Sequence, residues 1–434
     1  MKIAILGFGK QGRSAYEYWH EGNEITVCDG NESLELPVDV GRQLGPDHLK
    51  GLDRFDLIVR SPIVYPPDIV DANSPAILDK VTTVTNEFFK VCPTKNIIGV
   101  TGTKGKGTTS TLIAEMLEAD GRTVHLGGNI GTPPLDMLRS GIQPDDWVVL
   151  ELANFQLIDL RYSPHIAVCL MVVPEHLDWH ADSEEYFTSK QQLFEKQTDE
   201  DIAIYYSENE VSRRIASAGK GRKIPYMTTP GASVAAGQIV IDDHEVCATS
   251  EVKLLGRHNL QNSCAAVTAV WQVTQNIEAM RSVLNSFSGM EHRLELVREL
   301  DGVRYYNDSF GTTPETAIVA VQAFEEPKVI ILGGSDKGAD YAELAQVVAG
   351  ASIRKVLLIG EQAQRIGKAL AAAGVRNQDV MPGGETIGEI VDTARAQAQA
   401  GDIVLLSPAC ASFDMFKNYQ DRGEKFKQAV LGLA

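Results

Sequence analysis

The residues best suited to chemistry form a glycine-rich run that contains a lysine at its centre. It reads Thr101-Gly102-Thr103-Lys104-Gly105-Lys106-Gly107-Thr108-Thr109. An apolar stretch at 96–100 precedes the run, and a helix-forming stretch at 109–119 follows it. Backbone N–H groups of a loop that opens a helix surround phosphate oxygens, and a lysine there adds a positive charge. The pattern predicts that residues 102–109 bind the phosphates of ATP, with Lys106 on the β- and γ-phosphates.

This loop departs from the strict pattern G-x-x-x-x-G-K-[ST] at both ends. Val100 stands at the first glycine position, and Gly107 follows the lysine. A hydroxyl after the lysine usually binds Mg²⁺. Because Gly107 has none, we expect Thr108 to take that role, while a glycine turn without nucleotide stays the alternative.

A second glycine loop lies at the start of the chain. Gly7-Phe8-Gly9-Lys10-Gln11-Gly12 matches G-x-G-x-x-G between an apolar run at 2–6 and a helical stretch at 14–20. Asp29 follows the next strand, 24–28, where an acid that binds a ribose or a base would lie. From this loop alone three interpretations stay open: a dehydrogenase, a nucleotide-diphosphate substrate site, or a tight turn without ligand.

Strands and helices alternate along nearly the whole chain, which predicts an α/β protein. Strands are expected at 2–6, 24–28, 55–59, 96–100, 123–126, 147–152, 166–172, 202–206, 239–241, 328–332, 355–359 and 402–406. Helices are expected at 14–20, 109–119, 259–287, 341–348, 362–373 and 387–400. These groups predict three domains: a Rossmann-like domain at 1–90, a P-loop ATPase-type domain at 91–290 and a Rossmann-like domain at 291–434.

The composition narrows the function classes. The 434 residues carry a formal net charge of -18, which argues against a nucleic-acid partner. The six cysteines form no C-x-x-C pair, so a disulfide framework or zinc site is not indicated. Apolar runs are too short for a signal peptide or a membrane span. We therefore expect a cytoplasmic protein with no nucleic-acid partner and no membrane insertion.

A series of short motifs, in chain order, resembles the Mur ligase family, which builds the peptide stem of peptidoglycan. The matching segments are 102–106, 127–131, 151–157, 174–178, 186–190, 256–262, 291–295, 307–309, 333–338 and 406–414. The resemblance covers nearly the whole chain. The final segment, with Phe416, Asn418, Arg422, Gly423 and Phe426, is similar to the members that add glutamate.

The resemblance implies a reaction and its substrates. The carboxylate of UDP-N-acetylmuramoyl-L-alanine would take the γ-phosphoryl group of ATP to give an acyl phosphate. The amino group of D-glutamate would then attack, and phosphate would leave. Phosphoryl transfer of this kind needs mainly positioning and neutralisation of charge. The resemblance also implies a monomer.

The resemblance assigns roles to individual residues. Catalytic positions would be Lys106, Lys190, His176 and Asn129. Two Mg²⁺ ions would be held by Glu151, His176, Lys190 and Thr108, with Lys190 carbamylated so that a cation becomes an anionic oxygen ligand. Further ATP contacts would come from Asn262, Arg293 and Asp308, and the amino-acid pocket from Thr312, Lys337, Ser412, Phe413 and Tyr419. The UDP group would contact Gly9, Lys10, Gln11, Asp29 and Ser61.

Several positions differ from what the family commonly has. Ala153 and Asn154 stand where two serines are common, and Phe310 stands where a lysine is common. Ile63 replaces the glycine of a Ser-Pro-Gly turn. A ligase for L-glutamate or another amino acid, or an inactive nucleotide-binding homologue, therefore stays as an alternative. A dehydrogenase would leave the second loop and the C-terminal motifs unexplained.

Overall fold

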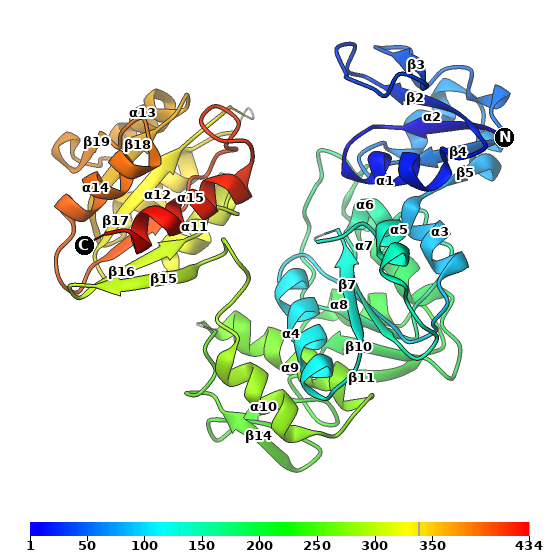
Figure 1. The fold of residues 1–434 in the computed structure, drawn as a ribbon. Coiled ribbons are helices and arrows are strands. Elements are labelled where there is room, and N and C mark those ends of the chain that lie inside the picture. Colours follow the sequence, from blue (N-terminus) through cyan, green and yellow to red (C-terminus); the bar gives the residue numbers. More distant parts are fainter. Residues whose placement is uncertain (130, 255, 337–338, 434) are drawn as a thin grey trace. The chain divides into compact units, whose positions relative to one another are not determined.

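The computed structural model describes residues 1–129, 131–254, 256–336 and 339–433. It divides into two compact units, Met1–Lys253 with Arg257–Phe287, and Leu254–Gly256 with Ser288–Ala434. Figure 1 draws the first unit in blue to green and the second in yellow to red. Both units are built from mostly parallel sheets with helices between the strands, which confirms the α/β prediction. The predicted boundary near 90 falls inside the first unit and stays a prediction.

The first unit opens with a five-stranded parallel sheet in the order β3-β2-β1-β4-β5. Its strands are β1 (Lys2–Leu6), β2 (Glu24–Asp29), β3 (Gly41–Leu44), β4 (Leu57–Arg60) and β5 (Val81–Thr82). Its helical segments are α1 (Lys10–Trp19), η1 (Leu52–Arg54), α2 (Pro66–Ala72), η2 (Pro75–Lys80) and α3 (Val84–Val91). The strand order reverses at β1, so its carboxyl end is the position where such sheets bind ligands.

A six-stranded parallel sheet follows in the same unit, in the order β11-β10-β9-β6-β8-β7. Its strands are β6 (Ile97–Thr101), β7 (Val124–Gly128), β8 (Trp147–Glu151), β9 (Ile166–Cys169), β10 (Ile202–Tyr206) and β11 (Arg222–Tyr226). The helical segments are α4 (Lys106–Ala119), α5 (Pro134–Met137), η3 (Leu138–Ser140), α6 (Asn154–Leu157), α7 (Ser183–Glu195), α8 (Glu210–Ala216), α9 (Arg257–Trp271) and α10 (Ile277–Ser286). A small antiparallel sheet adds β12 (Ser233–Ala235), β13 (Gln238–Ile241) and β14 (His244–Ala248). Strands β6, β8 and β9 are buried along their whole length, as expected for a parallel sheet covered on both faces.

The second unit contains a six-stranded sheet in the order β15-β16-β20-β17-β18-β19. Its strands are β15 (Glu295–Leu300), β16 (Val303–Asn307), β17 (Lys328–Gly333), β18 (Ile353–Ile359), β19 (Val380–Pro382) and β20 (Ile403–Leu406). The helical segments are α11 (Pro314–Gln322), α12 (Ala342–Gly350), α13 (Ala363–Ala372), η4 (Asn377–Asp379), α14 (Ile387–Gln397) and α15 (Tyr419–Leu431). Only the edge pair β15 and β16 is antiparallel among the strands of this sheet that the structure describes.

Two predicted helices differ from the observed ones for physical reasons. The first begins at Lys10 rather than near residue 14, because the end of the glycine loop forms its first turn. The stretch at 259–287 is divided between α9 and α10, and the Asn276 side chain accepts a hydrogen bond from the Ala279 N–H at the new start. None of the helices in the described segments combines the length and apolar character that crossing a bilayer requires.

Candidate active site

The glycine-rich loop connects the buried strand β6 to helix α4, the helix labelled in Figure 1. Gly102 and Gly105 have φ angles of 150° and 86°, which disfavour any side chain. A Cβ on Gly105 would lie 2.3 Å from Asn262 Oδ1, and one on Gly102 would lie 2.7 Å from the Leu170 Cβ. The loop is therefore shaped by its neighbours, and Asn262, a predicted ATP contact, packs directly against it.

Lys106, the first residue of α4, folds back over this loop. Its Nζ donates to the carbonyl oxygens of Gly102 at 3.0 Å and Thr103 at 2.8 Å. Thr103 is itself fixed by its hydroxyl, which donates to Val173 O at 2.9 Å and lies 2.9 Å from the Tyr186 hydroxyl. The ammonium group thus sits beside the loop backbone, where it can neutralise phosphate charge.

The two threonines after Gly107 differ in how far they reach solvent. Thr109 is fully buried, and its Oγ1 has no hydrogen-bond partner among the described residues. Thr108 retains 7% exposure. Thr108 is thus the less buried of the two, and its role as an Mg²⁺ ligand stays a prediction.

Lys190 of α7 lies beneath the same loop. It is 1% exposed, and its Nζ donates to Gly102 O at 3.1 Å and lies 4.5 Å from the centre of the Tyr186 ring. Burial, with the charge of Lys106 as a second cause, lowers the pKa of Lys190 to about 7. Lys190 is therefore a buried amine, a substantial fraction of which is neutral near pH 7.

Glu151 and Asn129 meet at the ends of β8 and β7. Glu151 is 4% exposed, and the Asn129 side-chain amide donates to its Oε1 at 3.4 Å. The Asn129 backbone N–H also donates to Glu151 O at 2.8 Å. A Cβ on Gly128 would lie 2.2 Å from that carbonyl, so the glycine permits this close approach of the two strands. Two predicted residues are thus held together beside the loop.

His176 lies in a turn with a φ of 57°. Its ring packs against Phe155 at 4.8 Å and Tyr186 at 6.4 Å between ring centres. Partial burial lowers its pKa, although Glu175 acts in the opposite direction. A neutral imidazole has a nitrogen lone pair free to bind a metal.

The side chains of Glu151 and His176 could bind Mg²⁺ only together with further oxygen ligands. No cluster of three or more His, Cys, Asp or Glu side chains able to hold a metal occurs within the described segments. Glu151 and His176 supply one carboxylate and one imidazole, while Mg²⁺ favours oxygen ligands. A carbamate on Lys190, the Thr108 hydroxyl and phosphate oxygens would supply the oxygens that these two residues lack.

The N-terminal loop is closed by side chains that were predicted to bind UDP. Asp29 accepts from the N–H groups of Phe8 and Asn31, both at 2.9 Å. Ser61 donates to Gly7 O at 2.8 Å. Asp29 and Ser61 therefore hold the loop in place.

The remaining predicted UDP residues lie on the loop and at the start of α1. A Cβ on Gly9 would meet nothing within 4 Å, so there is room for a ligand beside it. Lys10 hydrogen-bonds to Gly131 O, in the loop that follows β7. The side-chain oxygen of Gln11 is buried without a hydrogen-bond partner in the part of the chain that the structure describes.

Sequence reasoning missed the residues that join the first sheet to the central one. Arg60 at the end of β4 has a fully buried side chain and binds Asp159 with two hydrogen bonds of 2.8 and 2.6 Å. Trp179 Nε1 donates to Ile63 O at 3.1 Å, and the Tyr65 hydroxyl donates to Glu185 at 2.7 Å. These partners lie about a hundred residues apart in sequence, so no local pattern signals them.

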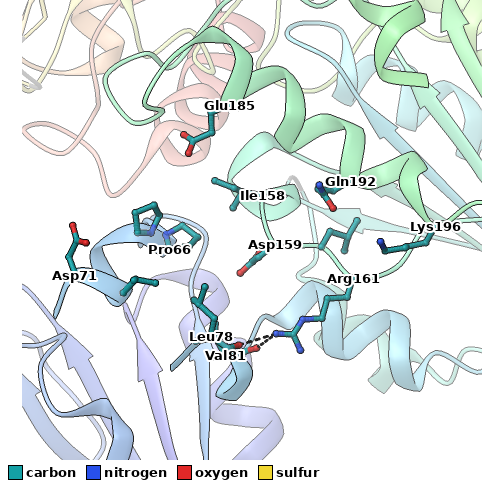
Figure 2. A pocket seen from close by; sticks show the side chains of 13 residues that line it. Pro66, Asp71, Leu78, Val81, Ile158, Asp159, Arg161, Glu185, Gln192 and Lys196 are labelled. Carbon is teal, nitrogen blue, oxygen red and sulfur yellow. Dashed lines mark hydrogen bonds between the residues drawn. The ribbon is translucent and has the colours of Figure 1, made fainter. Parts of the chain in front are cut away.

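A cavity of about 640 Å³ lies along the same border. Figure 2 shows its wall formed by the segment around Pro66 on one side and by Ile158 and Gln192 on the other. Arg161 closes one end by donating to the carbonyls of Leu78 at 3.2 Å and Val81 at 2.8 Å. The cavity shares Asp159 and Glu185 with the contacts described above, and the phosphate loop is not part of its lining.

In the second unit, Asp308, directly after β16, is almost fully buried. Its oxygens accept from the Ser407 hydroxyl at 2.7 Å and the Leu294 N–H at 3.2 Å. Burial raises the pKa of this carboxyl to about 7 against the opposing effect of Ser407 and Arg293. The predicted ATP residue Arg293 lies with its guanidinium 5.5 Å from the Phe310 ring centre.

Arg422 of α15, which is fully buried, fixes the loops next to several residues predicted for the amino-acid pocket. Arg422 donates to Ser309 Oγ at 2.9 Å, Ser309 O at 2.8 Å and Cys410 O at 3.2 Å. These contacts fix the loops that follow β16 and β20. Sequence reasoning noted Arg422 only as part of a motif, not as the residue that fixes these loops.

The pocket residues themselves differ in exposure. Ser412 is buried, whereas Phe413 is 68% exposed and Thr312 is half-buried. Tyr419 packs edge-on against Phe310, with ring centres 5.3 Å apart. Lys337 lies outside the described residues.

Comparison with known proteins agrees with this geometry. The Mur ligase middle domain matches residues 100–270, and the Mur ligase glutamate ligase domain matches 292–410. The UDP-N-acetylmuramoylalanine–D-glutamate ligase of Clostridium tetani is 35% identical over 450 residues, covering 100% of this chain and 97% of that protein. The enzyme of the same name from Clostridium kluyveri is 36% identical over 446 residues, covering 99% and 96%.

A solved structure shows the same fold. The UDP-N-acetylmuramate–alanine ligase of Thermotoga maritima has a TM-score of 0.58 at 16% identity, and 99% of each chain is covered. Together with the two domain matches and the relatives from Clostridium, this likeness extends over the whole chain. The chain therefore belongs to the Mur ligase family.

Proposed function

We propose that this chain catalyses the ATP-dependent addition of D-glutamate to UDP-N-acetylmuramoyl-L-alanine, a step of peptidoglycan precursor synthesis. The full-length identity of about 35% to enzymes named for that reaction supports the choice of substrates. The observation that carries the chemistry is the convergence of Lys106 and Lys190 on the Gly102 carbonyl. A lysine cation, Lys106, and a second lysine that can become an oxygen ligand, Lys190, beside a phosphate loop suit phosphoryl transfer.

The reaction balances as two displacements. A carboxylate oxygen of the substrate forms a bond to the γ-phosphorus, and the bond between that phosphorus and the leaving ADP oxygen breaks. The neutral amine of glutamate then bonds to the acyl carbon, the bond from carbon to the phosphate oxygen breaks, and one proton is released with the phosphate. Lys106 would stabilise the charge on the transferring group.

Lys190 would act as a carbamate. Its amine would add to carbon dioxide with loss of one proton, and only a neutral amine can do this. The lowered pKa of Lys190 supports that role, because a substantial fraction is neutral near pH 7. When bound, Mg²⁺ would neutralise phosphate charge, and Glu151, His176, Thr108 and the carbamate would hold two such ions.

In the second unit, Asp308 and Arg293 would contact ATP. Thr312, Lys337, Ser412, Phe413 and Tyr419 would form the amino-acid pocket. In the first sheet, the open space beside Gly9 would admit the UDP group. We place the reaction in the cytoplasm, where ATP is available, with a single chain as the active species.

A second candidate is an inactive nucleotide-binding homologue, favoured by Gly107 and Ala153. One assay decides between the two. The purified chain is mixed with ATP, Mg²⁺ and UDP-N-acetylmuramoyl-L-alanine, with D- or L-glutamate in parallel, and phosphate and product mass are followed. We expect phosphate and a glutamyl product with D-glutamate only, and neither from Lys106→Met. A product formed with L-glutamate would show that the amino-acid substrate is not restricted to D-glutamate. No product with either isomer would overturn the proposal.

A further inference from the structure

A row of four hydrogen-bonded side chains crosses the border between the first and central sheets. The Tyr65 hydroxyl donates to Glu185 Oε1 at 2.7 Å, and Glu185 Oε2 lies 3.0 Å from His180 Nδ1. His180 Nε2 lies 2.8 Å from the side-chain nitrogen of Asn154. The side chain of His180, at the centre of the row, is fully buried.

The chemistry of the neighbours fixes how the protons are arranged. A carboxylate can only accept, so His180 Nδ1 carries the proton that faces Glu185. The Ala181 N–H donates to the same carboxylate oxygen at 2.9 Å. His180 Nε2 then accepts from the Asn154 amide at 2.8 Å, which requires a ring that is not protonated at this nitrogen. With His180 protonated at Nδ1 alone, each hydrogen bond of the row has one donor and one acceptor.

The ends of this row lie beside residues that the proposed reaction uses. Asn154 opens α6, three residues after Glu151. The His180 N–H donates to His176 O at 3.0 Å, so the two histidines share one turn. Tyr65 lies in the same turn as Ser61. Its ring packs edge-on against Trp179, with ring centres 4.7 Å apart.

The row also gives a reason for a departure from the family. Members of the family commonly have serine where this chain has Asn154. A serine hydroxyl is shorter than an asparagine amide, and here the longer amide reaches His180. The amide therefore completes a connection that runs from the first sheet to the carboxyl end of β8.

We propose that His180 is a positioning residue for the ligation: held in one tautomer between Glu185 and Asn154, it couples the 61–65 turn to the turn that carries His176. The inference rests on the proposed function, because the coupled turns are those assigned to UDP and to metal. It predicts that loosening the Tyr65 end disturbs binding of the UDP-linked substrate, while ATP binding at 102–109 is unaffected.

The test compares the steady-state kinetics of Tyr65→Phe, His180→Gln and the double variant in the full chain. Tyr65→Phe keeps the ring against Trp179 and removes only the hydrogen bond to Glu185. We expect it to raise KM for UDP-N-acetylmuramoyl-L-alanine about tenfold, as the loss of one hydrogen bond to a charged group would. KM for ATP should stay within about twofold. Tyr162→Phe is the matched control, since Tyr162 stacks on Phe89 away from the row.

A connected row predicts that the two changes are not independent. The double variant should be no worse than His180→Gln alone, because either change already breaks the same connection. Effects that multiply, or a KM for ATP that rises as much as that for the UDP-linked substrate, would overturn the proposal. So would a Tyr65→Phe variant that behaves like Tyr162→Phe while the wild type is active.

A spectroscopic measurement keeps the proposal testable if a variant unfolds or the wild type shows no ligase activity. Protein labelled with ¹⁵N-histidine, with His180 assigned from the spectrum of His180→Gln, should show a neutral ring protonated at Nδ1. Glu185→Gln should change that tautomer. A ring protonated at Nε2, or at both nitrogens, would refute the row independently of the reaction, whereas an inactive wild type with the expected tautomer would refute only the proposed function.

Discussion

The pair formed by Arg60 and Asp159 offers the sharpest test of how the first sheet is attached to the central one. Asp159→Asn keeps the shape of the side chain and removes its charge. The Arg60 side chain is fully buried and would keep only neutral partners, among them Val64 O at 2.9 Å and Phe155 O at 3.0 Å. Breaking a buried ion pair costs about 3–5 kcal/mol. Because the Asp159 side chain is 24% exposed, water compensates in part, and we expect about 2–3 kcal/mol.

Urea unfolding followed by circular dichroism measures this loss. With a slope of about 3 kcal/mol per M, the midpoint for the first unit should fall by roughly 1 M. Glu184→Gln is the control, because it breaks an ion pair with Arg214 whose side chains are 67% and 46% exposed. Such a surface pair contributes at most about 1 kcal/mol. A midpoint for Asp159→Asn that matches the control would refute the view that this buried pair holds the two sheets together.

Three further predictions concern the predicted site residues. Gly105→Ala should abolish ATP binding measured by calorimetry, since its Cβ would meet Asn262 Oδ1 at 2.3 Å; normal affinity would contradict the loop geometry. Lys190→Ala should abolish turnover, and wild-type turnover at constant dissolved CO₂ should fall as pH drops through about 7, because protonation removes the amine that forms the carbamate. A flat pH profile would argue against carbamylation. Asp308→Asn should stabilise the second unit at pH 8, because a carboxyl whose pKa rises from 3.8 to about 7 on folding opposes folding above that pH, by at most about 4 kcal/mol. The same variant should bind ATP more weakly, and an unchanged or lower midpoint of thermal unfolding at pH 8 would contradict the burial argument.

The sequence predicted most of the buried parallel strands because these are short apolar runs. It did not predict eight of the observed strands: β3, β5, β11, β12, β14, β15, β16 and β19. The expected strand at 2–6 is β1 itself, and the run at 328–332 differs from β17 by one residue. The glycine loops were also recognised from sequence, since Gly102 and Gly105 adopt angles that other residues disfavour. The start of α1 was misplaced because a glycine loop and a first helical turn share residues: Gly12 lies in the helix and still packs against Gly7, where a Cβ would meet Gly7 O at 2.0 Å.

The contacts between the two sheets of the first unit could not be predicted in the same way. Arg60 and Tyr65 look like ordinary surface residues after a strand, and their partners follow about a hundred residues later. Which side chains meet depends on how two separately formed sheets dock, and local periodicity carries no information about docking. The burial of Lys190 has the same origin, because it depends on α7 lying beneath the loop after β6.

The central claim is that the substrate carboxylate is activated by the γ-phosphoryl group of ATP. The most direct test uses UDP-N-acetylmuramoyl-L-alanine labelled with ¹⁸O in its free carboxylate, together with D-glutamate, ATP and Mg²⁺. An attacking carboxylate oxygen stays with phosphorus when the amine displaces it, so each released phosphate should carry one ¹⁸O atom from the substrate. Unlabelled phosphate, released as fast as the glutamyl product forms, would contradict the account.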